Sequence, residues 1–264
     1  MTIPQRVLIT GAAGRVGREM RRHLRGVYPR LRLSDIAPLQ READGEEVDA
    51  TDLTDLAAVL AMMEGVDAVV HLGGIAAERD WADLQAANIL GTFNVFEAAR
   101  MRRVQRVVYA SSNHAIGFYE RSQRIDHTAI PLPDSRYGVS KAVGESLGAL
   151  YAHKHGIRVM SIRIGNFGPR PLEARHLSIW VSPRDLAQLV RIGLEHPELR
   201  HEVVYGVSGN RRSWWDNANA RRLGYAPQDD AEAWAADLPP AAPPTAADDA
   251  IAERYQGGRY CTFP

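Results

Sequence analysis

The most constraining feature of this sequence is a regular alternation, between residues 6 and 164, of short apolar segments with segments of helical periodicity. The apolar segments are residues 6–10, 31–35, 46–50, 67–74, 106–112 and 158–164, and the helical segments are residues 15–26, 56–63, 83–103 and 139–155. Strands that are apolar along their whole length are typical of a parallel sheet covered by helices on both faces. The pattern therefore predicts an α/β fold with a doubly wound parallel sheet.

Residues 166–264 follow this pattern less closely. A helix is predicted over residues 183–196, with Pro183 in its first turn, and one more strand over residues 202–208. Residues 237–250 are rich in Pro and Ala, so we expect neither regular helix nor central strand there, but a tail that runs over the surface. We expect residues 1–165 to form a nucleotide-binding core and residues 166–264 a small substrate-binding portion, packed as a single unit.

The composition limits the partners that this chain could have. Its 32 basic and 32 acidic residues cancel, which argues against nucleic acid or an anionic membrane as a partner. The single cysteine, Cys261, cannot form an internal disulfide, and no Cys/His spacing predicts a metal site. We find neither a leader-like segment nor an apolar run of about 18 residues, so we expect a cytoplasmic protein.

A glycine-rich loop, TGAAGRVG (10–17), joins the first strand to the first helix. Gly11, Gly14 and Gly17 would allow a tight turn and a close approach of main-chain N–H groups to a pyrophosphate at the helix N-terminus. An ordinary strand–helix turn is the alternative. Asp35, at the end of the second strand, has the position of a carboxylate that binds an adenosine ribose and repels the 2′-phosphate of NADP, although it could also be a solvated strand end. These features together predict a Rossmann-type site for NAD.

A second candidate unit combines Tyr137, Lys141 and Ser112. Tyr137 and Lys141 are four residues apart, so on a helix they share a face. A phenol is a poor base at neutral pH, and a neighbouring ammonium is expected to lower its pKa. The hydroxyl of Ser112, at the end of a predicted core strand, could share the substrate oxygen. A surface Tyr–Lys pair on an amphipathic helix is the alternative. The glycine loop and Asp35 favour the functional interpretation over this alternative.

The segments TGAAGRVG, HLGG, VVYASSN and YGVSK resemble those of the extended short-chain dehydrogenase/reductase family, over essentially the whole chain. The resemblance implies that Tyr137 is the acid/base, that Lys141 tunes it and binds the ribose, and that Ser112 hydrogen-bonds the substrate. It also implies that Asn88 supports the site. Further implied cofactor-binding residues are Ala13, Arg15, Val16, Asp52, Leu53, Leu72, Gly73, Gly74, Ser111 and Ile164.

Other segments, among them SSNHAIGFY (111–119), RIGNFGPRPLEARHLSIW (163–180) and RYQGGRY (254–260), closely resemble the uronate dehydrogenases, a branch of this family. The resemblance implies oxidation of the C1 hydroxyl of cyclic D-glucuronate or D-galacturonate by NAD⁺ to an aldarolactone. Arg175 would bind the substrate carboxylate. The other implied substrate-binding residues are Ser112, Asn113, His114, Tyr137, Asn166 and Tyr260.

Some of these assignments have alternatives. His114 could be structural, His71 is best explained as structural, and Arg175 could be one of many solvated arginines. The family pattern has Ser where this chain has Ala76 and Asn166, and Ala76 offers no side-chain hydrogen bond. The other functions we considered are a different small-substrate dehydrogenase, a sugar epimerase and a non-catalytic NAD-sensing regulator. Because family members often pair through two long helices, here residues 83–103 and 139–155, we also expect a homo-oligomer.

Overall fold

The computed structural model describes residues 3–239 and 247–264. Its centre is a seven-stranded sheet with every neighbouring pair parallel, in the order β3-β2-β1-β4-β5-β6-β9. The strands are β1 (Arg6–Thr10), β2 (Arg30–Ser34), β3 (Glu46–Asp49), β4 (Ala68–His71), β5 (Arg106–Ser112), β6 (Arg158–Ile164) and β9 (His201–Gly206). The predicted doubly wound α/β fold is thereby confirmed.

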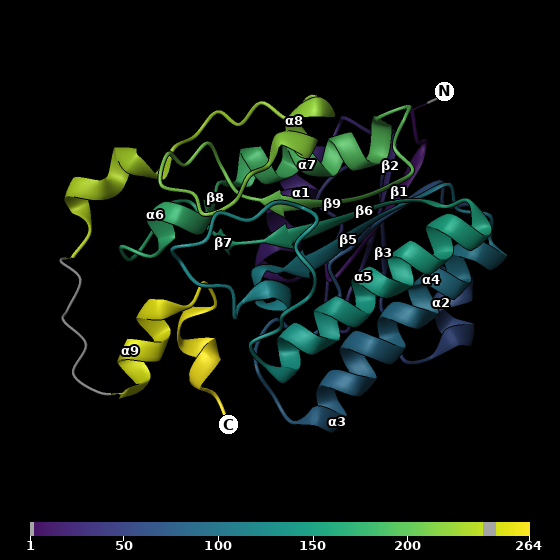
Figure 1. Cartoon of the computed structure of the whole chain (residues 1–264). Coiled ribbons are helices and arrows are strands. Elements are labelled where there is room, and N and C mark those ends of the chain that lie inside the picture. The colour runs from purple at the N-terminus through teal and green to yellow at the C-terminus, as the bar shows by residue number, and fades with distance from the viewer. Residues whose placement is uncertain (1–2, 240–246) are drawn as a thin grey trace.

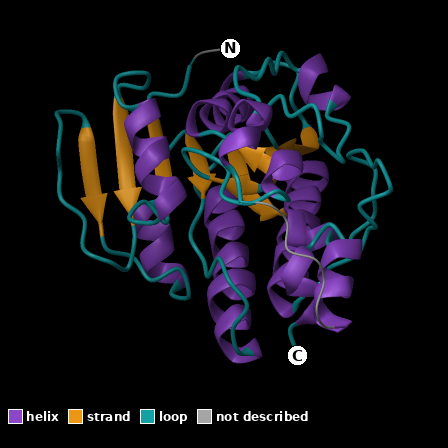
Figure 2. Ribbon diagram, turned by 90° about the vertical axis from the view of Figure 1, so that its left-hand side faces the viewer, coloured by secondary structure: helices purple, strands orange, loops and turns teal. Residues whose placement is uncertain are grey.

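Helices cover both faces of this sheet (Figures 1 and 2). One face packs against α1 (Arg15–Leu24) and α7 (Pro183–Glu195), and the other against α2 (Leu56–Met62), α4 (Gly91–Met101) and α5 (Arg136–His155). Alternate residues of a strand enter the two cores: Val7 and Ile9 face α1, whereas Leu8 faces the opposite layer. This alternation is the period of two that a strand imposes on its side chains.

The predicted helix over residues 83–103 is built from three segments. It comprises α3 (Trp81–Leu84), a π-helical segment (Gln85–Leu90) and α4. The wider π turn carries Asn88, and such turns often occur at functional sites. The helix predicted over residues 139–155 begins earlier, at Arg136, because Ser135 caps it by accepting a hydrogen bond from the N–H of Gly138 at 3.0 Å. Tyr137 and Lys141 therefore both lie on α5, as expected.

The C-terminal part contributes to both the sheet and the site. β9 pairs with β6, and α7 contributes to the helical layer beside α1, so these elements of the C-terminal part share one core with the strands of residues 6–164. A short parallel pair, β7 (Asn166–Phe167) with β8 (Trp180–Val181), and helix α6 (His176–Ile179) follow β6. The helix α8 (Ala218–Arg222) lies beside β9. The division of roles at residue 165 remains a proposal.

The tail forms more helix than the sequence predicts. The expectation that residues 237–250 hold no regular helix is wrong for residues 247–250, which open α9 (Ala247–Arg254); residues 240–246 lie outside the described part. The last proline of this stretch is Pro244, and Asp248 and Asp249 in the first turn interact favourably with the helix dipole. The tail lies at the edge toward which β5 and β6 point (Figure 1). Among the described residues, no helix is long and apolar enough to cross a membrane.

Candidate active site

A cavity of about 790 Å³ lies at the carboxyl ends of the central strands, between them and the tail. In an open parallel sheet this edge, where the strand order reverses, is the usual place for a ligand, and the reversal here falls between β1 and β4. The cavity brings together most of the residues singled out from the sequence: Arg15, Val16, Leu72, Gly74, Ser111, Ser112, Asn113, His114, Tyr137, Lys141, Ile164, Asn166, Arg175 and Tyr260.

The glycine loop after β1 is packed too closely for larger residues. Gly11 has a φ of +68°, and a Cβ there would lie 2.7 Å from the main chain of Leu72 and of Gly73. A Cβ on Gly17 would lie 2.2 Å from the carbonyl oxygen of Gly11. Gly14 is the N-cap of α1. The loop is therefore held against the end of β4 and the start of α1, an arrangement that fits a dinucleotide pyrophosphate.

Asp35 contacts the glycine loop directly. One carboxylate oxygen accepts a hydrogen bond from the N–H of Ala13 at 3.0 Å, and the other accepts one from the N–H of Ala37 at 3.0 Å. Asp35 thus joins the loop after β1 to the loop after β2. It does not line the cavity, nor do the other residues predicted for the adenosine and pyrophosphate end: Gly11, Ala13, Gly14, Gly17, Asp52, Leu53 and Gly73.

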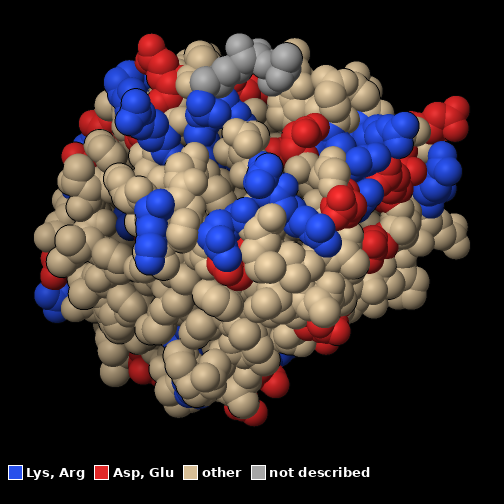
Figure 3. Space-filling model, turned by 90° about the vertical axis from the view of Figure 1, so that its right-hand side faces the viewer, with Lys and Arg blue, Asp and Glu red and all other residues tan. Residues whose placement is uncertain are grey.

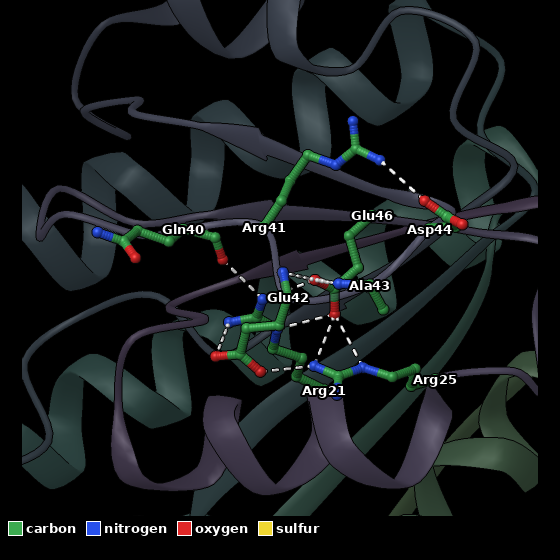
Figure 4. Close-up of polar contacts among 8 residues, drawn as sticks. All are labelled: Arg21, Arg25, Gln40, Arg41, Glu42, Ala43, Asp44 and Glu46. Carbon is green, nitrogen blue, oxygen red and sulfur yellow. Dashed lines mark hydrogen bonds and ion pairs between the residues drawn. The ribbon is translucent and has the colours of Figure 1, made fainter.

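The loop after Asp35 is held in place by an ion-pair network (Figure 4). The guanidinium of Arg21, on α1, donates to both oxygens of the buried carboxylate of Glu46, at 2.9 and 2.6 Å. Arg25 and Glu42 complete the cluster. The hydrogen bonds to Arg21 lower the pKa of Glu46 to about 2 despite its burial. No feature of the sequence signals this network, because its partners lie on separate segments.

Asn88 lies outside the cavity and supports its wall. Its side-chain oxygen accepts from the N–H of Ile75 at 2.7 Å, and its amide nitrogen donates to the carbonyl of Ile75 at 3.0 Å and to the hydroxyl of Ser140 at 2.9 Å. The π turn thus ties the loop after β4 to α5 beside Tyr137. His71 is likewise structural: its two ring nitrogens bond to Thr10 and Thr92, and burial lowers its pKa to about 3.

Tyr137, Lys141 and Ser112 meet in the cavity. The ammonium nitrogen of Lys141 lies 5.7 Å from the ring centre of Tyr137 and donates to the carbonyl of Ala110 at 2.9 Å. The hydroxyl of Ser112 bonds to the phenol of Tyr137. The three groups come from α5 and from the end of β5, so a substrate hydroxyl can meet Tyr137 and Ser112 together.

Burial dominates the acidity of this cluster. It raises the pKa of Tyr137 to about 12, against the lowering by the bond to Ser112. Burial also lowers the pKa of Lys141 to about 8. The expected net lowering of the Tyr137 pKa by the lysine is therefore wrong for this pocket, because loss of water disfavours the phenolate more than the polar neighbours favour it.

Ser111 and Ser112 have different roles although they are adjacent. The side chain of Ser111 donates to Glu145 of α5 at 2.6 Å, and Glu145 forms a buried ion pair with Arg163 of β6 at 2.9 Å. Ser111 thus belongs to the wall that joins α5 to the sheet. The side chain of Ser112 instead caps the 3₁₀ turn Asn113–Ile116.

Asn113 and His114 begin that turn and face the cavity. The side-chain nitrogen of Asn113 is buried and has no hydrogen-bond partner in the described part of the chain, so it can donate to a ligand oxygen. The Nδ1 atom of His114 lies 2.8 Å from the buried carboxylate of Asp134, and its ring stacks on Tyr260 with centres 3.7 Å apart. Tyr260 belongs to the 3₁₀ turn Gly258–Thr262, so the tail closes this side of the cavity.

Arg175 lies opposite, in the segment between β7 and α6. Among the described residues it forms no ion pair; its Nε and Nη2 atoms donate to the main-chain carbonyl of Gln256. Burial lowers its pKa to about 10, so the guanidinium remains charged at neutral pH. The solvated-arginine alternative is wrong. A partly buried guanidinium that faces the cavity, with no carboxylate of the described residues within ion-pair distance, fits an anionic group on the ligand.

Ala76 and Asn166 also line the cavity. Sequence reasoning missed the supporting residues Asp134, Glu78 and Gln256. The Glu78 carboxylate accepts from the N–H of Tyr137 at 2.8 Å and pairs with Arg136, so it holds the first turn of α5 at Tyr137. No local signal could have revealed these residues, because each acts on a partner far away in the chain.

Comparisons with known proteins agree with this geometry. The model of the NAD dependent epimerase/dehydratase family matches residues 7–216. The chain is 47% identical to the uronate dehydrogenase of Pseudomonas putida over 256 aligned residues. These residues make up 97% of this chain and 95% of that protein.

Two solved structures are similarly close. The glucuronic acid dehydrogenase from Chromohalobacter salexigens has a TM-score of 0.95 and 43% identity, over 99% of this chain and 98% of that one. A mutant uronate dehydrogenase from Agrobacterium tumefaciens complexed with NAD has a TM-score of 0.93 and 41% identity, over 98% of both chains. The chain therefore belongs to the NAD dependent epimerase/dehydratase family.

Proposed function

We propose that this chain oxidises the C1 hydroxyl of cyclic hexuronates, D-glucuronate and D-galacturonate, to the aldarolactone with NAD⁺. Arg175 carries the proposal, because it is a partly buried, charged guanidinium that faces the cavity without an ion-pair partner among the described residues. A uronate differs from a neutral sugar by one carboxylate, which a guanidinium can bind through two parallel hydrogen bonds. The uronate dehydrogenases to which the chain is similar support the same substrate class.

The protein side of the reaction follows from the cluster at the end of β5. Ser112 holds the C1 hydroxyl, and the anionic form of Tyr137, which burial alone disfavours, takes its proton while the C1 hydride leaves. The Lys141 ammonium stabilises that phenolate. Bound NAD⁺ supplies the hydride acceptor, and its positive charge favours an anionic base. The buried amide nitrogen of Asn113 donates to a sugar hydroxyl.

Asp35 supports NAD over NADP. Its carboxylate is fixed by the N–H groups of Ala13 and Ala37 at the adenosine end of the glycine loop. A 2′-phosphate at this position would meet a fixed negative charge.

A parallel assay of NADH formation tests the proposed reaction. Uronates, neutral aldoses and UDP-sugars are compared at equal concentrations with NAD⁺. We expect turnover with uronates and far less with the other two classes, because neutral aldoses have no C6 carboxylate for Arg175 and the C1 oxygen of a UDP-sugar is bound to phosphate. Equal turnover of uronates and neutral aldoses would contradict the role of Arg175, and preference for UDP-sugars would favour an epimerase-type activity.

We also propose a homo-oligomer that pairs through α4 and α5. These helices expose large apolar side chains, namely Leu90 in the preceding π turn, Phe93, Met101, Val139 and Leu150. The lower part of the face in Figure 3, on the side where α4 and α5 lie in Figure 1, shows few charged side chains. Light scattering coupled to size exclusion tests this, and a monomer at micromolar concentration would refute it.

A further inference from the structure

The segment Gln256–Gly258 of the tail lies directly against Arg175. Gly258 has a φ of +65°, and a Cβ there would approach the Nε of Arg175 to 2.9 Å. A Cβ on Gly257 would lie 1.9 Å from a carboxylate oxygen of Asp134. The two glycines therefore allow the chain to pass between a buried carboxylate and the guanidinium, and they bring the carbonyl of Gln256 to that guanidinium.

Gln256 is completely buried, and all of its polar groups are bonded. Its side-chain nitrogen donates to the carbonyls of Glu120 and Gln123 at 3.1 and 3.0 Å, and its side-chain oxygen accepts from Nε1 of Trp215 at 2.8 Å. Its main-chain N–H donates to the carbonyl of Tyr119 at 2.8 Å. A buried glutamine with a complete set of partners is held rigidly, because each bond that it lost would leave a buried polar atom without a partner.

The orientation of Arg175 follows from this anchor. Nε and Nη2 both donate to the carbonyl of Gln256, so that edge of the guanidinium is occupied. The Nη1 hydrogens and the second Nη2 hydrogen have no partner among residues 3–239 and 247–264, and together they form the end-on edge that binds a carboxylate bidentately. A neutral carbonyl fixes the guanidinium without cancelling its charge.

We infer that Gln256 is a positioning residue for substrate recognition, which anchors the tail so that its own carbonyl aims Arg175 at the carboxylate of the sugar acid. The inference rests on the proposed function and names the residue that sets its specificity. Gln256 does not line the cavity and acts only through Arg175.

The test compares D-galacturonate with D-galactose, which has a CH₂OH group in place of the carboxylate. Gln256→Met keeps the volume of the side chain and removes its hydrogen bonds. We expect the ratio of kcat/KM for galacturonate to that for galactose to fall on the order of tenfold to a hundredfold, mainly through KM, because a charge-assisted contact is misaligned. The KM for NAD⁺ should stay at its wild-type value. Where galactose is not turned over, its competitive inhibition constant replaces its kcat/KM.

Two further variants complete the design. Gln123→Met is the matched control: Gln123 is an exposed glutamine in the loop whose main-chain carbonyls accept from Gln256, and its own side chain accepts from the N–H of Glu120 and does not contact Arg175 among the described residues. It should leave the ratio unchanged. Gly258→Ala pushes on Arg175 directly and should lower the ratio even if Gln256→Met does not fold. Arg175→Met should abolish the preference for galacturonate over galactose, and adding Gln256→Met to that variant should not lower the ratio further.

An unchanged ratio in Gln256→Met, or in Gly258→Ala if Gln256→Met does not fold, would overturn the inference. An equal fall in activity on both sugars would do the same, because it would show only structural damage. Calorimetric binding of galacturonate separates the two proposals. A wild-type protein that binds galacturonate but does not oxidise it would refute the proposed function, whereas the effect of the variants on that binding would still decide the role of Gln256.

Discussion

Lys141→Met should make the protein inactive and more stable. Burial lowers the pKa of Lys141 from its usual 10.5 to about 8. That difference corresponds to about 3 kcal/mol of folding free energy lost when the ammonium is buried. Removing the ammonium also removes its bond to the carbonyl of Ala110, which stabilises by about 1 kcal/mol. We therefore expect the variant to be about 2 kcal/mol more stable than wild type at pH 7.

The pH dependence distinguishes this mechanism from improved packing. The folded pKa is lower than the unfolded one, so the unfolded state binds more protons between about pH 8 and 10.5, and wild-type stability rises in that window. The advantage of Lys141→Met should be constant below pH 8 and should disappear near pH 10. Packing gains would not depend on pH.

Urea unfolding at pH 7 and at pH 10 measures both effects. The chain offers a matched control, because its only other lysine, Lys154, is exposed on the same helix. Lys154→Met should change stability by less than about 0.5 kcal/mol at either pH. A Lys141→Met variant that is no more stable than wild type at pH 7, or whose advantage persists at pH 10, would refute the reasoning.

Three other substitutions test the remaining parts of the site. Tyr137→Phe should lower kcat/KM by about 10²–10⁴ while calorimetry shows NAD⁺ binding unchanged, and near-normal turnover would remove Tyr137 from the mechanism. Asp35→Ser should raise the ratio of NADP to NAD use by about tenfold in steady-state kinetics, and an unchanged ratio would show that Asp35 does not repel the 2′-phosphate. Glu46→Gln should cost about 2 kcal/mol in urea unfolding at pH 7. Because the pKa of Glu46 is lowered to about 2, that difference should shrink as the pH falls from 4.5 toward 2, and a constant difference would contradict the charge argument.

Local sequence patterns were sufficient to predict the parallel sheet and the pairing of Tyr137 with Lys141. The parallel order requires only buried strands and intervening helices, and the i, i+4 spacing of Tyr137 and Lys141 places them on one face of α5 because that helix begins at Arg136 and includes both. The start of α5 was predicted three residues late, because the cap depends on the side chain of Ser135. The short helix after residue 246 was missed because the prolines before it dominate the composition of that stretch.

The pKa of Tyr137 could not be predicted in the same way. Spacing shows that an ammonium is near, but the pKa depends on how much water the fold removes from the phenol, and that quantity belongs to the packed protein. Similarly, the sequence contains Arg175 among many arginines. Its place on the cavity wall, bonded to the carbonyl of Gln256, distinguishes it from the solvated ones, and only the fold shows that place.

The sequence by itself determined the fold class, the cofactor loop and the pairing of Tyr137 with Lys141, because periodicity and short spacings are properties of neighbouring residues. The tertiary structure alone decided which charges are buried, which side chains face the cavity and how the tail aims Arg175. Those properties arise where segments more than 80 residues apart in the chain, such as Arg175 and Gln256, come into contact. No local pattern encodes such a contact, because its free energy depends on the solvent that both partners exclude.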